Sequence, residues 1–86
     1  MREAEFRAFL EEQSLTVDGI ATRLRWARRD EAYLGCTLDE AVRDDTSMRD
    51  ALLRLREVDD PAHAPRQNAL RKYYTFVHGK AFPRLS

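Results

Sequence analysis

The chain has 86 residues, of which 43% are hydrophobic and 35% are charged, and its formal net charge at pH 7 is zero. This length allows one small domain, and this balance of residues is typical of a soluble folded domain rather than a disordered chain. The single cysteine excludes an internal disulfide, and no apolar run approaches the roughly 18–20 residues of a membrane span. Because the N-terminal residues also lack the apolar core of a signal peptide, we expect a cytoplasmic protein with no membrane partner.

The residue usage predicts an all-α fold. Valine and isoleucine together number only five, and no segment alternates apolar and polar residues. Apolar residues recur instead at the three- and four-residue spacing of a helix face. We therefore expect a compact bundle of four principal helices and one short helix over residues 1–80, followed by an irregular tail over residues 81–86.

Caps and apolar stripes predict the first two helices. The first covers residues 3–13, and Thr16 is expected to cap a second helix that ends at Gly35. The residues expected to face inward on the first helix are Phe6, Phe9 and Leu10. On the second helix they are Val17, Ile20, Leu24, Ala27 and Leu34.

Two further helices are predicted before a loop over residues 59–65. Asp39 is expected to cap a short helix with the sequence EAVRDD. Ser47, with Asp50 three residues later, resembles a capping box that begins the next helix. The inward residues of that helix are expected to be Met48, Ala51, Leu52, Leu55 and Val58.

The last helix is predicted between Pro65, which a first helical turn accepts, and Gly79, which favours a left-handed cap. Its apolar side consists of Ala69, Leu70, Tyr73, Phe76 and Val77. We expect the centre of the core to be Tyr73, Phe76 and Val77 packed against Phe6, Phe9, Leu24 and Leu52. Tyr74 is expected to be half-exposed.

The charges divide unevenly along the chain. Residues 1–65 carry 10 basic and 15 acidic side chains, whereas residues 66–86 carry five basic and no acidic ones. The two parts therefore contribute −5 and +5, which sum to the net charge of zero. A helix with an apolar side and a purely basic back indicates a polyanionic partner.

Three segments in this order resemble the SAM-like core-binding domain of tyrosine recombinases and phage integrases. The first is FRAFLEEQSLTVDGIATRLRWARRDEAYLG, which resembles that family's F-x-x-F-L helix, turn and Thr-opened helix ending in Leu-Gly. The second is LDEAVRDDTSMRDALLRL, in the place of a short helical segment. The third is APRQNALRKYYTFVHG, which resembles a final helix of the form A-L-R-x-[FY]-[FY]-x-[FY]. The residues of this pattern are Ala69, Leu70, Arg71, Tyr73, Tyr74 and Phe76.

The resemblance implies a SAM-like helical bundle that contacts duplex DNA without catalysis, as part of a recombinase or integrase system. It also implies that the second and last helices approach the DNA. The catalytic domain of that family has no counterpart in these 86 residues. We therefore expect no strand cleavage by this chain and no nucleophilic role for Tyr73 or Tyr74.

Two sets of residues are the candidate DNA contacts. The first is Arg25, Arg28 and Arg29, whose spacing places them together on the second helix, where guanidinium groups can follow a phosphate backbone. The second set, on the last helix, is Arg66, Gln67, Arg71 and Lys72. The alternative for both sets is ordinary solvated helix surface, laced for the arginines by Asp30 and Glu31.

A protein-interaction module is the alternative function. Residues 39–60 carry eight acidic and four basic side chains, unlike the basic surface common in core-binding domains. That acidic face is one candidate docking site. Trp26 is another, because it lies off the apolar line of its helix and either fills a groove between helices or is an exposed anchor.

The remaining reactive residues do not form a catalytic or metal-binding pattern. Cys36, His63 and His78 are too few and too scattered for a closed zinc site. The neighbouring carboxylates occur at expected helix ends or in the loop, where such groups are usually solvated. We therefore expect no enzyme activity, no cofactor, no metal and no small-molecule substrate.

Overall fold

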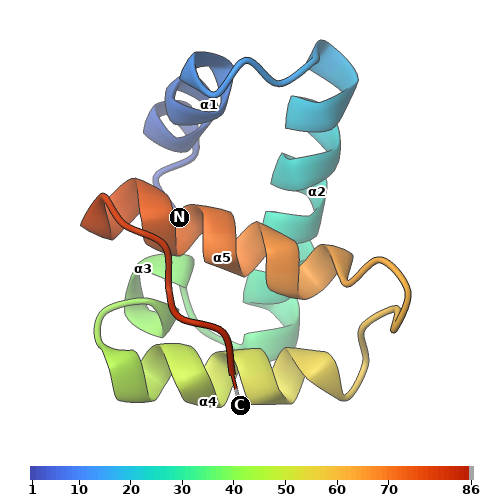
Figure 1. The fold of residues 1–86 in the computed structure, drawn as a ribbon, viewed down its shortest axis with the longest axis vertical. Helices are drawn as coiled ribbons and strands as arrows, with labels where there is room; N and C mark the ends of the chain where they lie inside the picture. The colour runs from blue at the N-terminus through green and yellow to red at the C-terminus, as the bar shows by residue number, and fades with distance from the viewer. Residues whose placement is uncertain (86) are drawn as a thin grey trace.

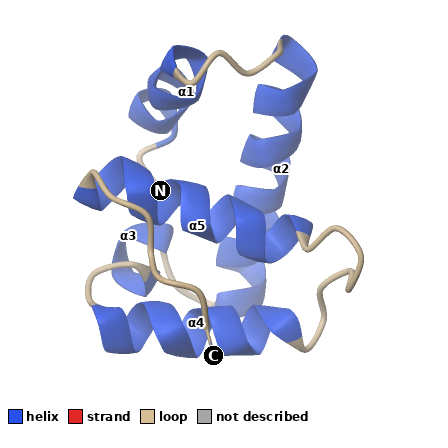
Figure 2. Cartoon of the chain, in the orientation of Figure 1, coloured by secondary structure: helices blue, strands red, loops and turns tan. Residues whose placement is uncertain are grey.

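Five helices make up the regular secondary structure of residues 1–85, the part of the chain that the computed structural model describes (Figure 1 and Figure 2). They are α1 (Glu3–Glu12), α2 (Val17–Leu34), α3 (Leu38–Ala41), α4 (Asp45–Arg56) and α5 (Pro65–His78). The predicted all-α fold is therefore confirmed. None of the helices in these residues combines the length and hydropathy that a membrane crossing requires.

Helix α5 occupies the middle of the molecule. It crosses α2, the longest helix, and lies between α1 at one end and α4 with the short α3 at the other (Figure 1). After α5 the chain turns back and runs over α5 toward α4. Helix α5 is thus in contact with each of the other four helices.

The core is one cluster contributed by all five helices. Its largest fully buried side chains include Tyr73, Phe6, Leu10, Leu24, Leu38, Met48, Leu52, Leu55 and Leu70. The ring of Tyr73 meets the edge of Phe6 at a centroid distance of 4.9 Å and that of Phe76 at 5.3 Å. Tyr73 and Phe6 are therefore central, whereas Phe76, Val77 and Phe9 are only partly buried at the rim of the core.

The ends of α2 form as their residue types predict. The Thr16 hydroxyl accepts a hydrogen bond from the backbone N–H of Gly19 at 3.0 Å, so it caps the first turn. Gly35 ends the helix with a φ of 74°, a left-handed conformation that costs glycine little.

The caps of α3 and α4 differ from the prediction. Thr37, and not Asp39, caps α3, and its side chain accepts from the N–H of Glu40 at 3.2 Å. The cap of α4 is Asp44, whose carboxylate accepts from the N–H of Ser47 at 2.8 Å. Ser47 therefore lies in the first turn and is a donor to the cap. In both cases the cap is a polar residue two or three positions before the predicted one. The helix begins directly after that residue.

Three predictions of burial are wrong. Val17 is 83% exposed because it is the first residue of α2, and Val58 is 47% exposed because it follows the end of α4. Tyr74, expected to be half-exposed, is only 3% exposed. The reason is tertiary, since Phe82 from the returning tail packs edge-on against the Tyr74 ring at 5.1 Å.

The tail is fastened to α5. The Arg71 guanidinium donates to the carbonyl oxygen of Phe82 at 2.9 Å and to that of Pro83 at 3.4 Å. Residues 81–85 therefore have no regular structure, as predicted, but lie against the helices. The last residue of the predicted tail, Ser86, lies outside the described residues.

Candidate nucleic-acid interface

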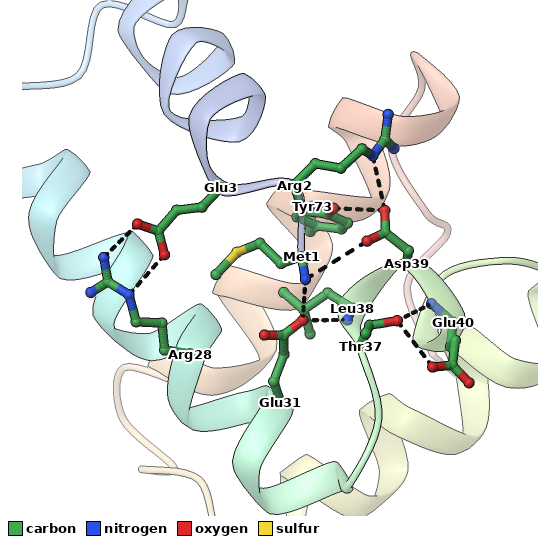
Figure 3. Close-up of polar contacts among 10 residues, drawn as sticks. All are labelled: Met1, Arg2, Glu3, Arg28, Glu31, Thr37, Leu38, Asp39, Glu40 and Tyr73. Carbon is green, nitrogen blue, oxygen red and sulfur yellow. Dashed lines mark hydrogen bonds and ion pairs between the residues drawn. The ribbon is translucent and has the colours of Figure 1, made fainter.

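Arg28 forms an ion pair with Glu3 of the first helix. Its Nε and one terminal nitrogen each donate to the Glu3 carboxylate at 2.8 Å (Figure 3), and this bidentate pair raises the pKa of Arg28 and lowers that of Glu3. The expected partner on its own helix, Glu31, instead accepts from the ammonium of Met1 at 2.7 Å and from the Leu38 N–H at 2.8 Å. The charge of Arg28 is therefore already neutralised within the fold.

Arg25 and Arg29 are exposed on the outer side of α2. Arg25 donates to the hydroxyl of Thr22 at 3.2 Å, and Arg29 stacks on the Trp26 ring at 4.7 Å from its centroid. Arg28 points from the same helix toward α1. The three arginines of the first predicted set thus lie on one helix, but each contacts a different partner.

Arg66 and Gln67 shape the beginning of α5. Ala64, which precedes that helix, has a φ of 45° and no side-chain cap. Asp59 caps the helix from the loop instead, because its carboxylate accepts the N–H groups of Arg66 and Gln67, both at 3.0 Å. The Gln67 side-chain amide also donates to Asp59, at 3.1 Å. The Arg66 guanidinium is turned inward, between the rings of Trp26 and Tyr33 at 5.4 and 5.6 Å.

A continuous basic surface covers the outer side of α5. One hollow on it is lined by Arg23, Asn68, Arg71, Lys72 and Thr75. The adjoining hollow shares Asn68 and Arg71 and adds Arg56 and Arg84 among its lining residues. No acidic side chain lines either hollow. We call the five cations Arg23, Arg56, Arg71, Lys72 and Arg84 the α5 basic surface.

Within residues 1–85, the cations of the α5 basic surface are not neutralised by carboxylates. None of the five takes part in an ion pair within residues 1–85. The arginines that do form ion pairs there lie elsewhere in the molecule. The Nε of Arg23 is buried without a hydrogen-bond partner, and burial lowers the pKa of this side chain. Burial, with the nearby charge of Arg84, also lowers the pKa of Arg71. Such desolvated, mutually repelling cations favour an anion close by.

Of the predicted site residues, Arg71 and Lys72 belong to this surface, and Gln67 also lines its second hollow. Arg84 lies in the C-terminal segment that has no acidic residue, so the charge pattern could have predicted it as part of the site. Arg23 had a weaker signal, since it lies on the flank of α2 that faces α5. Arg56 had none, because only the folded chain brings the end of α4 beside Asn68 of α5.

The acidic residues expected to form a docking face are mostly engaged inside the molecule. Asp39 accepts from the Tyr73 hydroxyl at 2.7 Å and from the Nε of Arg2 at 3.0 Å (Figure 3). Asp45 accepts from the Tyr74 hydroxyl at 3.3 Å. The carboxylates in residues 39–60 that accept at least one hydrogen bond are Asp39, Glu40, Asp44, Asp45, Asp59 and Asp60.

Trp26 fills a boundary position rather than an exposed one. It is partly buried, packs against the core cluster, and is covered by the guanidinium groups of Arg29 and Arg66. Of its two interpretations, the groove between helices is therefore the one that the structure supports.

Comparisons with models of known protein families, with curated proteins and with solved structures find no match for this chain. Within the described part of the chain, no three His, Cys, Asp or Glu side chains come together in a way that could hold a metal ion. The site is thus defined by its own residues, as an electropositive surface with two shallow hollows.

Proposed function

We propose that this chain is a non-catalytic module that binds duplex DNA through the α5 basic surface. The observation that carries the proposal is the segregation of charge. In a chain of zero net charge, five cations from α2, α4, α5 and the tail line two adjoining hollows, whose lining in residues 1–85 includes no acidic side chain. The resemblance to core-binding domains of recombinases and integrases, which use the second and last helices, selects duplex DNA among polyanions.

The proposed contacts are to phosphates. Arg56 and Arg84 are the exposed charges of the surface, and the half-buried Lys72 and Arg23 line the same hollow from α5 and α2. Such contacts release condensed counterions and set the position of the protein without specifying a sequence. We expect an affinity in the micromolar range or weaker at physiological salt, with a steep salt dependence.

The non-catalytic part of the proposal is supported by Tyr73 and Tyr74. Burial raises the pKa of the Tyr73 hydroxyl to about 12, and this hydroxyl is occupied by Asp39 and by the N–H of Arg2. Tyr74 is covered by the tail. Neither hydroxyl is placed to attack a phosphodiester.

The protein-interaction alternative has less support. Its acidic face is largely engaged in helix caps and in hydrogen bonds to tyrosines, and Trp26 is covered by arginines.

Fluorescence anisotropy with a labelled duplex tests the proposal. The single substitutions Lys72→Gln and Arg84→Gln should each weaken binding several-fold and reduce the slope of log K against log salt by about 1, whatever the DNA sequence. Arg25→Gln and Arg29→Gln are matched controls, because they remove equal charge from the outer side of α2. If the α2 controls weaken binding and the α5 variants do not, the α5 basic surface is the wrong site.

A further inference from the structure

Asp30 is the only fully buried charged residue in residues 1–85. It lies on the core side of α2, is 0% exposed, and neither carboxylate oxygen has a hydrogen-bond partner. The nearest guanidinium nitrogen, Nη1 of Arg66 on α5, is 3.8 Å from Oδ1, which is beyond hydrogen-bonding distance. That nitrogen is itself buried and without a hydrogen bond. A carboxyl group in these surroundings lacks the solvation that its ionised form requires.

The charged groups around Asp30 do not replace that solvation. The Arg66 guanidinium is flanked by two aromatic rings and comes no closer to Asp30 than 3.8 Å. Asp59, in the loop before α5, repels a charge on Asp30. On α4, Arg54 is turned to the Leu34 carbonyl at 3.4 Å and to the Tyr33 ring. Burial therefore outweighs the attraction of Arg66 and, together with Asp59, raises the pKa of Asp30 to about 8.

We propose that Asp30 is a proton-binding site in the crossing of α2 and α5, and that it makes the packing of these two helices sensitive to pH near neutrality. Protonated, Asp30 is a neutral group in the core and leaves Arg66 to its aromatic neighbours. Ionised, it attracts Arg66 inward and draws water toward the crossing. Arg23 on α2 and Lys72 on α5 line one hollow. If the proposed DNA site is correct, the proton on Asp30 also sets the distance between these two phosphate contacts.

The sign of the effect on stability follows from proton binding. The folded protein keeps the Asp30 proton up to about pH 8, whereas the unfolded chain releases it near the ordinary value of 3.8. Between these limits the folded state binds more protons, so this group makes the folded state progressively less stable as pH rises. Below the lower limit both states are protonated and the effect vanishes. Above the upper limit it is constant.

Melting temperatures of the parent and of Asp30→Asn, measured from pH 4 to pH 9, test the proposal. Asparagine keeps the shape of the neutral carboxyl and cannot titrate. The two curves should lie closest near pH 4 and separate as pH rises, with Asp30→Asn the more stable by at least about 4 °C more at pH 8 than at pH 4. All other titratable groups are common to both proteins, so they do not alter the difference.

Asp50→Asn is the matched control, because Asp50 is exposed on α4 and makes no ion pair in the described residues. Its curve should run parallel to that of the parent. A pH-independent offset of Asp30→Asn would mean packing alone and would overturn the proposal. Carboxyl ¹³C NMR decides the matter even if Asp30→Asn fails to fold. A titration midpoint for Asp30 above pH 7 supports the site, and one near pH 4 overturns it. Neither measurement contains DNA, so failure of the DNA proposal would leave this inference standing.

Discussion

At the scale of single residues, Tyr73 contributes most to the organisation of the core. Its hydroxyl donates to Asp39 at 2.7 Å (Figure 3). The hydroxyl also accepts from the backbone N–H of Arg2 at 2.9 Å, and the ring packs against Phe6. Burial opposes the ionisation of Asp39, but the bonds from Tyr73 and Arg2 outweigh it and lower the pKa of that carboxyl. One phenol thus joins α5, α3 and the residue before α1.

We predict that Tyr73→Phe lowers the free energy of unfolding by about 1–3 kcal/mol, because Asp39 loses a donor and the Arg2 N–H is left without an acceptor. Urea denaturation measures the loss. Tyr33→Phe is the control, since the Tyr33 hydroxyl makes no hydrogen bond in residues 1–85 and its removal should cost less than about 0.5 kcal/mol. Equal losses in the two variants would show that the Tyr73 hydroxyl is not structural.

Residue patterns predicted which positions are apolar more accurately than which are central. Tyr73 was expected in the core and is there, because its neighbours at helical spacing are also buried. Phe76 is less buried, and Tyr74 more buried, than expected. Phe76 is at the rim beneath the guanidinium of Arg2, at 5.0 Å, and Tyr74 is covered by the tail. Both depend on chain segments more than five residues away, which helical periodicity does not describe.

At the scale of elements, the beginning of α5 depends on a residue outside the helix. Asp59 supplies the cap that Ala64 lacks, five residues before the usual position, and satisfies two of the unpaired N–H groups of the first turn. Its charge is also favourable at the positive end of the helix dipole. The loop over residues 59–64 is therefore part of the helix's structure.

Asp59→Ala should destabilise the protein by about 1–2 kcal/mol and increase amide exchange in the first turn of α5. Thermal denaturation and hydrogen exchange measure the two effects. Glu57→Ala removes an acidic side chain from the same region, but Glu57 is exposed and makes no ion pair in residues 1–85, so it should be nearly neutral. If exchange in α5 is unchanged in Asp59→Ala, the distant cap is not what holds the first turn.

The helices were predictable because their signals are local. Thr16, Gly35, Pro65 and Gly79 act within a few residues of their own positions, and all four end or begin a helix where expected. Asp44 and Asp59 were missed as caps for different reasons. Asp44 competes with Ser47 in the same polar run, and Asp59 reaches its helix only through the folded loop.

At the scale of the whole molecule, the candidate site consists of basic side chains that form no ion pair within residues 1–85. Five of the fifteen basic residues form ion pairs within residues 1–85, and the five cations of the α5 basic surface are among the ten that do not. The sequence pattern indicated the basic side of α5. It could not show that Arg28 is paired with Glu3, nor that Arg23, Arg56 and Arg84 converge on α5, because these depend on how the helices cross.

The central claim is that duplex DNA binds on the α5 basic surface, and a titration followed by amide NMR at low salt tests it most directly. We predict that the amide signals of Arg23, Asn68, Lys72, Thr75 and Arg84 shift together, and that the shifts disappear as salt is raised. Signals of α1 and of the outer side of α2 should stay in place. A titration that leaves the five signals unmoved while the protein remains folded would contradict the claim.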